Sequence, residues 1–291
     1  MTIVVTGATG HLGRLVVESL LARGVPADQV VATGRNVSKI ADLADRGIST
    51  ARSDYDDVES LRQVFAGADK VLFVSGSEVG RRVTQHANVI QAAKEAGVGL
   101  LAYTSIANAD RTTMQMAAEH QATEQALAES GVPYALLRNS WYIENYTAQL
   151  PTYLEYGAVL GSADEGRVSG ATRADYAEAA AAVLTAEDQA GKVYELGGDD
   201  AFTMGELADA VARASGRPVT YQDLPVDEYT QVLVKAGLPE PYAAALADAD
   251  RGLAQGDLLV TSGDLSRLIG RPTTPMPDAV QAAVNAASNQ G

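Results

Sequence analysis

The 291-residue chain contains no cysteine, which excludes disulfide bonds, thiolate catalysis, iron–sulfur clusters and cysteine-based zinc sites. Basic residues are also scarce, because 22 Lys and Arg stand against 37 Asp and Glu, a formal net charge of −15. Nucleic-acid binding requires a basic surface that neutralises phosphates, so this balance argues against a nucleic-acid partner. The three histidines form no cluster with Asp or Glu that has metal-site spacing, and we expect no metal.

Long apolar runs are absent as well. No stretch approaches the roughly 20 residues that a membrane-spanning helix requires, and the N-terminus lacks the basic and apolar regions of a secretory signal. We therefore expect a cytoplasmic protein without a membrane span. Because 46% of the residues are hydrophobic, the chain can still bury a large core.

Short apolar runs alternate with amphipathic stretches through the first half of the chain. The apolar runs predict strands at Thr2–Thr6, Gln29–Thr33, Thr50–Arg52, Lys70–Ser75, Val98–Thr104 and Tyr134–Arg138. The stretches between them predict helices at Leu12–Arg23, Val37–Arg46, Val58–Phe65, Arg81–Ala96 and Met116–Ser130. Strands that alternate with helices form right-handed βαβ units, so we predict an α/β fold whose parallel sheet has helices on both faces.

This alternation stops after Asn139. A late helix at Asp175–Ala186, with Asp175 as its expected N-cap, and a late strand at Lys192–Leu196 follow a tyrosine-rich segment, and the chain is mostly helical from Thr203. We predict one domain at 1–140, to which 171–198 returns. A smaller, mostly helical C-terminal substrate lobe, made of 141–170 and 199–291, covers the strand ends.

A glycine-rich loop lies between the first strand and the first helix, with the sequence Gly7-Ala8-Thr9-Gly10-His11-Leu12-Gly13. Glycine lets the backbone approach a pyrophosphate or a neighbouring helix closely, and the helix N-terminus offers positive potential to the anion. In this position the loop predicts a dinucleotide-binding domain on a doubly wound, Rossmann-like sheet. The alternative is a tight turn without a ligand.

The residue at the end of the second strand indicates which dinucleotide binds. NAD sites carry an acidic residue there, whereas this chain has Arg35. A guanidinium pairs with a phosphate through two donors, so we predict NADPH/NADP+ as the cofactor, with Lys39 assisting and NADH at lower preference. A solvated surface arginine is the alternative. Asp54 and Tyr55 can contact the adenine, although Asp54 can equally cap the next helix.

Small hydroxyl and glycine residues follow the fourth and fifth strands. They are Ser75, Gly76, Ser77, Thr104 and Ser105. Because these positions lie at the carboxyl ends of parallel strands, we predict that they bind the cofactor's ribose and nicotinamide, and that Ser105 also contacts the substrate. Ser and Thr are equally common in loops that bind nothing.

Asn139, at the end of the sixth strand, is a further candidate for cofactor binding. Three aromatic residues follow it, Trp141, Tyr142 and Tyr146, and their rings can stack on a flat substrate. The alternative is an aromatic wedge that holds the smaller lobe to the sheet.

Segments spread over most of the chain carry a more specific signal: Gly7–Gly13, Gly34-Arg35, Asp54, Tyr103–Ser105, Leu137–Tyr146 (LRNSWYIENY), Ala171–Tyr176, Lys192–Leu196 and Gly270–Thr274. Together they resemble the NmrA-like, atypical short-chain dehydrogenase/reductase family. Leu137–Tyr146 in particular is similar to the bacterial type-2 NADPH:quinone oxidoreductases of that family. The resemblance implies a nucleotide domain with a small substrate lobe, NADPH as donor and quinones as acceptors.

The usual proton donor of short-chain reductases is missing. In that group a tyrosine, followed four residues later by lysine, protonates the carbonyl, and none of the twelve tyrosines here has that lysine. A ketone needs a positioned proton donor when it accepts hydride, whereas a quinone spreads the charge over its ring. In the related isoflavone reductases a catalytic lysine occupies the slot that holds His120 here. His120 and Tyr142 are the candidate catalytic residues, with a structural His120 as the alternative.

The sequence therefore predicts an oxidoreductase that transfers hydride from NADPH to a quinone or a similar conjugated carbonyl acceptor. Two other functions stay open: a reductase or tailoring enzyme that acts on an aromatic polyketide or other ketone, and a non-catalytic NADP(H)-sensing regulator that works through a partner protein. A homodimer is also left open.

Overall fold

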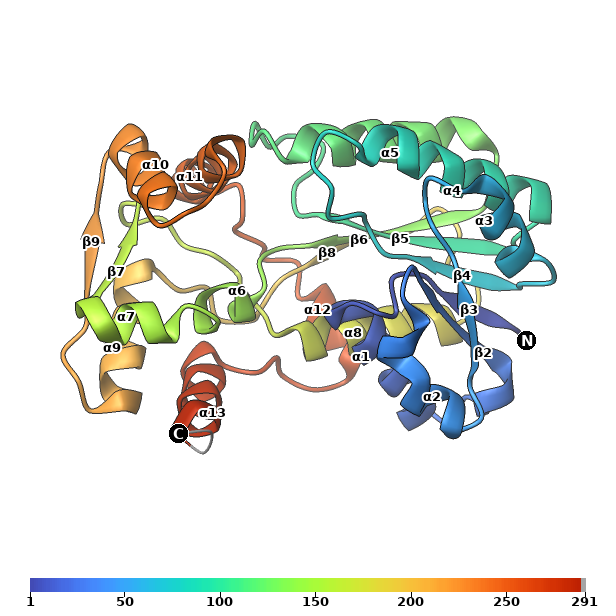
Figure 1. Ribbon diagram of the computed structural model, residues 1–291, viewed down its shortest axis with the longest axis horizontal. Helices are drawn as coiled ribbons and strands as arrows, with labels where there is room; N and C mark the ends of the chain where they lie inside the picture. The colour runs from blue at the N-terminus through green and yellow to red at the C-terminus, as the bar shows by residue number, and fades with distance from the viewer. Residues whose placement is uncertain (289–291) are drawn as a thin grey trace.

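The computed structural model describes residues 1–288, and a seven-stranded parallel sheet forms its centre (Figure 1). The strand order is β3-β2-β1-β4-β5-β6-β8. The strands are β1 (Ile3–Val5), β2 (Val30–Gly34), β3 (Ser49–Arg52), β4 (Lys70–Phe73), β5 (Leu100–Ile106), β6 (Tyr134–Asn139) and β8 (Val193–Leu196). Val5 lies opposite both Ala32 and Leu72, so neighbouring strands end at the same edge. The predicted α/β fold is confirmed, and each predicted strand is present.

Helices cover both faces of this sheet. One face carries α1 (His11–Ala22), α2 (Ala41–Asp45) and α8 (Arg173–Thr185), and the other carries α3 (Val58–Phe65), α4 (Arg82–Ala96) and α5 (Ala117–Ser130). Successive residues of β1 point into different cores, Ile3 and Val5 toward α1 and α8, and Val4 toward α3 and α4. This two-sided burial explains why the strands read as continuous apolar runs.

The same domain contains two short 3-10 segments, η1 (Ala27–Gln29) before β2 and η2 (Val37–Ile40) after it. The helix expected at Val37–Arg46 is therefore split into η2 and the short α2. Asn36 caps η2 by accepting a hydrogen bond from the Ser38 amide at 3.2 Å.

The smaller lobe lies on the left of Figure 1 and has its own core. It contains α6 (Ile143–Thr147), α7 (Leu150–Tyr156), β7 (Ala158–Gly161), α9 (Met204–Ser215), β9 (Thr220–Asp223), α10 (Val226–Lys235), α11 (Glu240–Ala254) and α13 (Met276–Ser288). Strands β7 and β9 form a separate parallel pair that we did not expect. Each has only four residues, and β9 (TYQD) is mostly exposed and polar, so the pair gives no strong strand pattern in the sequence.

Two details of the C-terminal half differ from expectation. Helix α12 (Asp264–Ile269) packs on α8 and β8, with Leu265 buried in the core of the first domain, so 199–291 does not lie wholly in the smaller lobe. The N-cap of α8 is Thr172, and Asp175 lies inside the helix, where its buried carboxylate binds Arg271 at 2.8 Å. Among residues 1–288, no helix is both long and apolar enough to cross a membrane.

Candidate dinucleotide and acceptor site

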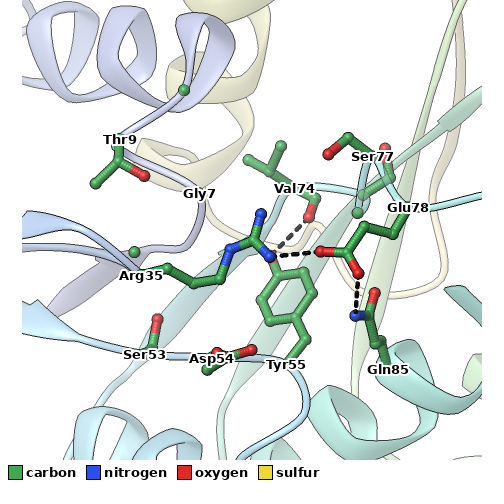
Figure 2. A pocket seen from close by; sticks show the side chains of 14 residues that line it. Gly7, Thr9, Arg35, Ser53, Asp54, Tyr55, Val74, Ser77, Glu78 and Gln85 are labelled. Carbon is green, nitrogen blue, oxygen red and sulfur yellow. Dashed lines mark hydrogen bonds and ion pairs between the residues drawn. The ribbon is translucent and has the colours of Figure 1, made fainter. Parts of the chain in front are cut away.

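Two cavities open at the carboxyl ends of the central strands. Strand β1 lies between β2 and β4, so the direction of strand addition reverses there, and ligands of doubly wound sheets bind at such a point. The first cavity has a volume of about 240 Å³ (Figure 2). Predicted cofactor residues in its wall are Gly7, Thr9, Gly10, Arg35, Asp54, Tyr55, Ser75, Gly76 and Ser77.

The glycine loop has the geometry that a pyrophosphate needs. Gly7 has φ +63°, and a Cβ on Gly13 would lie 2.4 Å from the Gly7 carbonyl oxygen, so only glycine allows α1 to begin this close to the loop. Gly10 is the N-cap of α1, and within the described residues no side chain caps this helix. Its first amide groups are thus available to bind an anion. Leu12 is buried in the core and serves packing.

Arg35 reaches across the mouth of the first cavity. Its side chain is 61% exposed, and Nη1 donates to Oε1 of Glu78, as Figure 2 shows. This bond, together with the charge of Arg35, lowers the pKa of Glu78. Gln85 and Arg81 also donate to Glu78, at 3.4 and 3.1 Å. The arginine is therefore placed to bind an anionic group, whereas exposed Lys39 is outside the cavity wall.

Asp54 lines the cavity and does not cap the next helix. The N-cap of α3 is Asp57, whose carboxylate accepts from the Ser60 amide at 3.2 Å. Asp54 instead accepts from the Asp56 amide within its own turn. The neighbouring Tyr55 donates its hydroxyl to the Val74 carbonyl at 2.7 Å, and burial raises its pKa, so it stays a neutral support of the β4 end.

Buried polar groups hold the loop that follows β4. Thr104 Oγ1 accepts from the Ser75 amide at 2.9 Å, and His86 Nε2 accepts from the Gly76 amide at 3.0 Å. Burial lowers the pKa of His86 to about 3, and Nδ1 of the neutral ring lies 2.8 Å from Thr123 Oγ1. Thr104 thus supports the loop after β4 through this hydrogen bond and does not line the cavity.

The second cavity is larger, about 1000 Å³, and lies between the two lobes. It meets the first cavity at Ser77, and Gly10 in one wall is followed by His11 in the other. Trp141 and Tyr146, two of the predicted substrate residues, line it. One extended ligand can therefore pass over the glycine loop from the first cavity into the second.

His120 is not in either cavity wall. Its side chain is buried on α5, and Nδ1 lies 2.7 Å from the hydroxyl of Tyr103. Burial lowers its pKa to about 3, so the ring is neutral near pH 7 and lacks the acidic proton of an imidazolium. The structure therefore corrects the expectation that His120 lines the site as a proton donor.

Tyr142 and Asn139 also lie outside the walls of both cavities. The Tyr142 ring contacts Tyr176, with centroids 5.4 Å apart, and carries the Arg173 guanidinium 4.7 Å from its centroid. Burial raises the pKa of Tyr142, so its hydroxyl stays protonated. Asn139 is buried, and its Oδ1 has no hydrogen-bond partner among residues 1–288. The structure favours a packing role for Tyr142.

Ser105 does not line either cavity. Its hydroxyl donates to Glu124 at 2.6 Å, and Glu124 pairs with Arg138, which also binds Glu195. Because successive side chains of a strand point to opposite faces, Thr104 and Ser105 cannot both face the Ser75 loop. The expected contacts of Ser105 with cofactor and substrate are therefore wrong for this geometry.

Sequence reasoning missed several residues that line the cavities. In the first cavity these are Gly34, Ser53, Val74, Glu78 and Gln85. In the second they include Arg82, Glu119, Arg173, Tyr153, Tyr229 and Asp250. Gly34 had a local signal, because it precedes Arg35 at the strand end and a Cβ there would lie 2.5 Å from Thr9 Oγ1. The residues of the smaller lobe had none, since only the tertiary fold brings them to the strand ends.

Three comparisons place this geometry among known proteins. The NmrA-like family model matches residues 1–256. The chain is 48% identical to quinone oxidoreductase 2 of Escherichia coli strain K12, over 97% of this chain and 99% of that protein. The crystal structure of the NADPH-dependent quinone oxidoreductase from E. coli in complex with NADPH superposes with a TM-score of 0.93 at 48% identity, covering 97% and 99% of the two chains.

A second solved structure is similar over nearly the same length. The Citrobacter triphenylmethane reductase in complex with NADP(H) matches with a TM-score of 0.91 and 40% identity, over 97% of this chain and 100% of that chain. The resemblance expected from the sequence is thus confirmed by sequence and by fold. The chain belongs to the NmrA-like family.

Proposed function

We propose that the protein is an NADPH-dependent oxidoreductase that reduces a quinone or a similar conjugated carbonyl acceptor. The observation that carries this proposal is the junction of the two cavities at Ser77. One cavity offers a glycine loop and Arg35, and the other offers an aromatic wall that includes Trp141 and Tyr146. The similar E. coli enzyme is described as NADPH-dependent and as a quinone oxidoreductase, which supports the same activity here.

The first cavity would hold the adenosine half of the dinucleotide. The uncapped amide groups of α1 would bind the pyrophosphate, and Arg35 would leave Glu78 to bind the additional phosphate of NADPH. Asp54 would accept a hydrogen bond from the adenine amino group. The Ser75–Ser77 loop would contact the ribose nearer the second cavity.

The second cavity would hold the nicotinamide and the acceptor together. Bound NADPH supplies the hydride, and the reduced quinone takes its remaining proton from solvent. Trp141 and Tyr146 would hold the flat acceptor ring and exclude water from it. The proposed hydride transfer needs no charged histidine in this cavity, because the quinone ring stabilises the incoming charge.

Steady-state oxidation of NADPH by a series of benzoquinones tests the proposal. Turnover that depends on both the quinone and the enzyme supports it, with NADPH preferred over NADH. Turnover with simple ketones instead of quinones would favour the ketone reductase, and tight binding of NADP+ and NADPH without turnover of any acceptor would favour the sensor. A homodimer and a cytoplasmic location remain predictions, which sedimentation velocity and cell fractionation can check.

A further inference from the structure

The wall of the second cavity contains a carboxylate that the proposed reaction does not use. Asp250, on α11, lines this cavity together with three tyrosines from three other helices: Tyr146 on α6, Tyr153 on α7 and Tyr229 on α10. Nothing in the hydride transfer requires an acid here, and the position shows no motif in the sequence.

One oxygen of Asp250 has a structural partner. Oδ2 accepts a hydrogen bond from the Ser162 amide at 2.9 Å, directly after β7. A Cβ on Gly161 would lie 2.9 Å from the same oxygen, so β7 is fitted closely to this carboxylate. Oδ1 has no hydrogen-bond partner within residues 1–288. The carboxylate thus has one oxygen anchored and one available in the cavity.

The tyrosine hydroxyls around Asp250 are also without partners. None of the hydroxyls of Tyr146, Tyr153 and Tyr229 forms a hydrogen bond in the described part of the chain. Burial, followed by the negative charge of Asp250, raises the pKa of all three, so the hydroxyls stay protonated. Tyrosine rings have electron-rich faces, which attract cations.

The wall of the second cavity contains more carboxylates than arginines. Arg82 pairs with Glu119, and Arg173 pairs with Glu144, each at 3.8 Å. Asp250 is the lining carboxylate without a cationic partner among residues 1–288. A buried carboxylate without a partner loses solvation that a bound cation would replace.

We propose that Asp250 and the surrounding tyrosines form a subsite for a positively charged nitrogen group, carried by the acceptor at a distance from its reacting ring. The inference rests on the proposed function, because it assumes that the acceptor occupies the second cavity. It adds a substrate preference: among quinone-type acceptors, those with an ammonium substituent bind best. The substituent takes no part in the hydride transfer, which stays the same for neutral acceptors.

The ionisation of Asp250 agrees with this role. Burial, with the charge of nearby Asp223 on β9 adding to it, raises its pKa to about 6, although the bond from Ser162 opposes the rise. The other titratable groups that face it are Tyr146, Tyr153, Tyr221 and Tyr229, which all stay neutral. The carboxylate is therefore mostly charged above about pH 7, and a bound cation would favour that form further.

A matched pair of benzoquinones tests the subsite. One has an alkyl tail that ends in a trimethylammonium group, and the other has the same tail ending in a tert-butyl group, which has nearly the same shape without the charge. At about pH 8 and saturating NADPH, we expect kcat/KM for the cationic quinone to exceed that for the neutral one by about tenfold. The difference should lie in KM. Equal values for the two quinones, or a preference for the neutral one, would overturn the inference.

The variant Asp250→Asn identifies the group responsible, because its amide oxygen can still accept from the Ser162 amide. We expect the ratio of kcat/KM for the cationic quinone to kcat/KM for the neutral quinone to fall from about tenfold to close to one. Asp200→Asn is the control, since it removes the same charge from an exposed position and should keep the ratio. A tenfold ratio that persists in the folded Asp250→Asn variant would contradict the proposal.

The wild-type comparison stands even if Asp250→Asn fails to fold. Tyr229→Phe then serves as a second variant: it keeps the aromatic face and is expected to retain most of the preference. Failure of the proposed function gives a different result, because the wild-type enzyme would then reduce neither quinone. Turnover of both quinones at equal kcat/KM would contradict the subsite alone.

Discussion

The two cavities of the active-site region are assembled in different ways. The first is built from residues 7–85, which follow consecutive strands of the sheet. The second combines residues from position 11 to position 250, and its aromatic residues come from the smaller lobe, whereas Arg82, Glu119 and Arg173 lie on helices of the first domain. The first is therefore visible in the sequence as motifs at strand ends, whereas the second exists only after the lobe has folded over the sheet. Cofactor binding and acceptor choice should respond to different substitutions.

Arg35→Ala should produce the largest separation between the two cofactors. Loss of charge-assisted bonds to the additional phosphate should weaken NADPH binding by about 10- to 100-fold, while NADH binding changes by less than about threefold. Calorimetric titration with each cofactor measures this. Arg213→Ala is the control, because it removes an equal charge from an exposed site in the smaller lobe. An unchanged NADPH-to-NADH ratio would show that Arg35 does not contact the phosphate.

Trp141→Ala should affect the acceptor cavity alone. Removing the indole from the wall should raise the quinone KM by about tenfold, with the dissociation constant for NADPH within about twofold of wild type. Trp141→Phe keeps a flat ring and should recover most of the loss. Equal losses of quinone binding and NADPH binding would mean that the two cavities do not bind their ligands independently.

Glu78→Gln should act in the opposite direction to Arg35→Ala. Glu78 forms an ion pair with the Arg35 guanidinium in the structure. Removing the charge of Glu78 should therefore tighten NADPH binding by about threefold without changing NADH binding. Glu59→Gln, at an exposed position on α3, controls for net charge. Weaker NADPH binding in Glu78→Gln would indicate that the carboxylate helps to hold the cofactor.

His120→Asn should change quinone turnover by less than about twofold, whereas a general acid typically contributes a hundredfold or more. Its effect should appear in stability. The unfolded chain protonates a histidine below about pH 6.5, but the folded pKa is about 3, so the native state loses stability as the pH falls through this interval.

Urea unfolding at neutral pH and at about pH 5 measures this acid sensitivity. We expect the variant to lose less stability on acidification than the wild type does, since one of its two buried histidines is gone. His11→Asn, at an exposed residue, should show the wild-type dependence. A large loss of turnover in His120→Asn would show that the histidine takes part in the reaction.

Much of the fold could be predicted because local patterns encode it. Two-sided burial makes β1 and β5 continuous apolar runs, and glycines such as Gly97 (φ +67°) end helices in a left-handed conformation. The boundaries were less accurate, since β5 runs from Leu100 to Ile106, two residues later than expected. The β7–β9 pair escaped prediction because its two strands are short and distant in sequence.

The candidate site could likewise be predicted only where local sequence patterns encode it. Gly7, Arg35 and Ser75 follow strands or precede a helix, so their positions in the site could be derived from the chain order. Ser105 and His120 were misplaced because sequence spacing does not say which face a side chain takes. Ser105 turns to the Glu124 ion pair and His120 to Tyr103, and both partners lie in other elements of the fold. Asp250 had no signal at all, since its environment comes from three other helices.

The central claim is that the two cavities form one continuous site for a phosphorylated dinucleotide and its acceptor. A crystal structure of the protein with NADP+ tests this most directly. We predict that the additional phosphate lies against Arg35, the pyrophosphate against the first turn of α1, and the nicotinamide in the cavity lined by Trp141 and Tyr146. A nicotinamide bound outside that cavity, or a phosphate away from Arg35, would contradict the account.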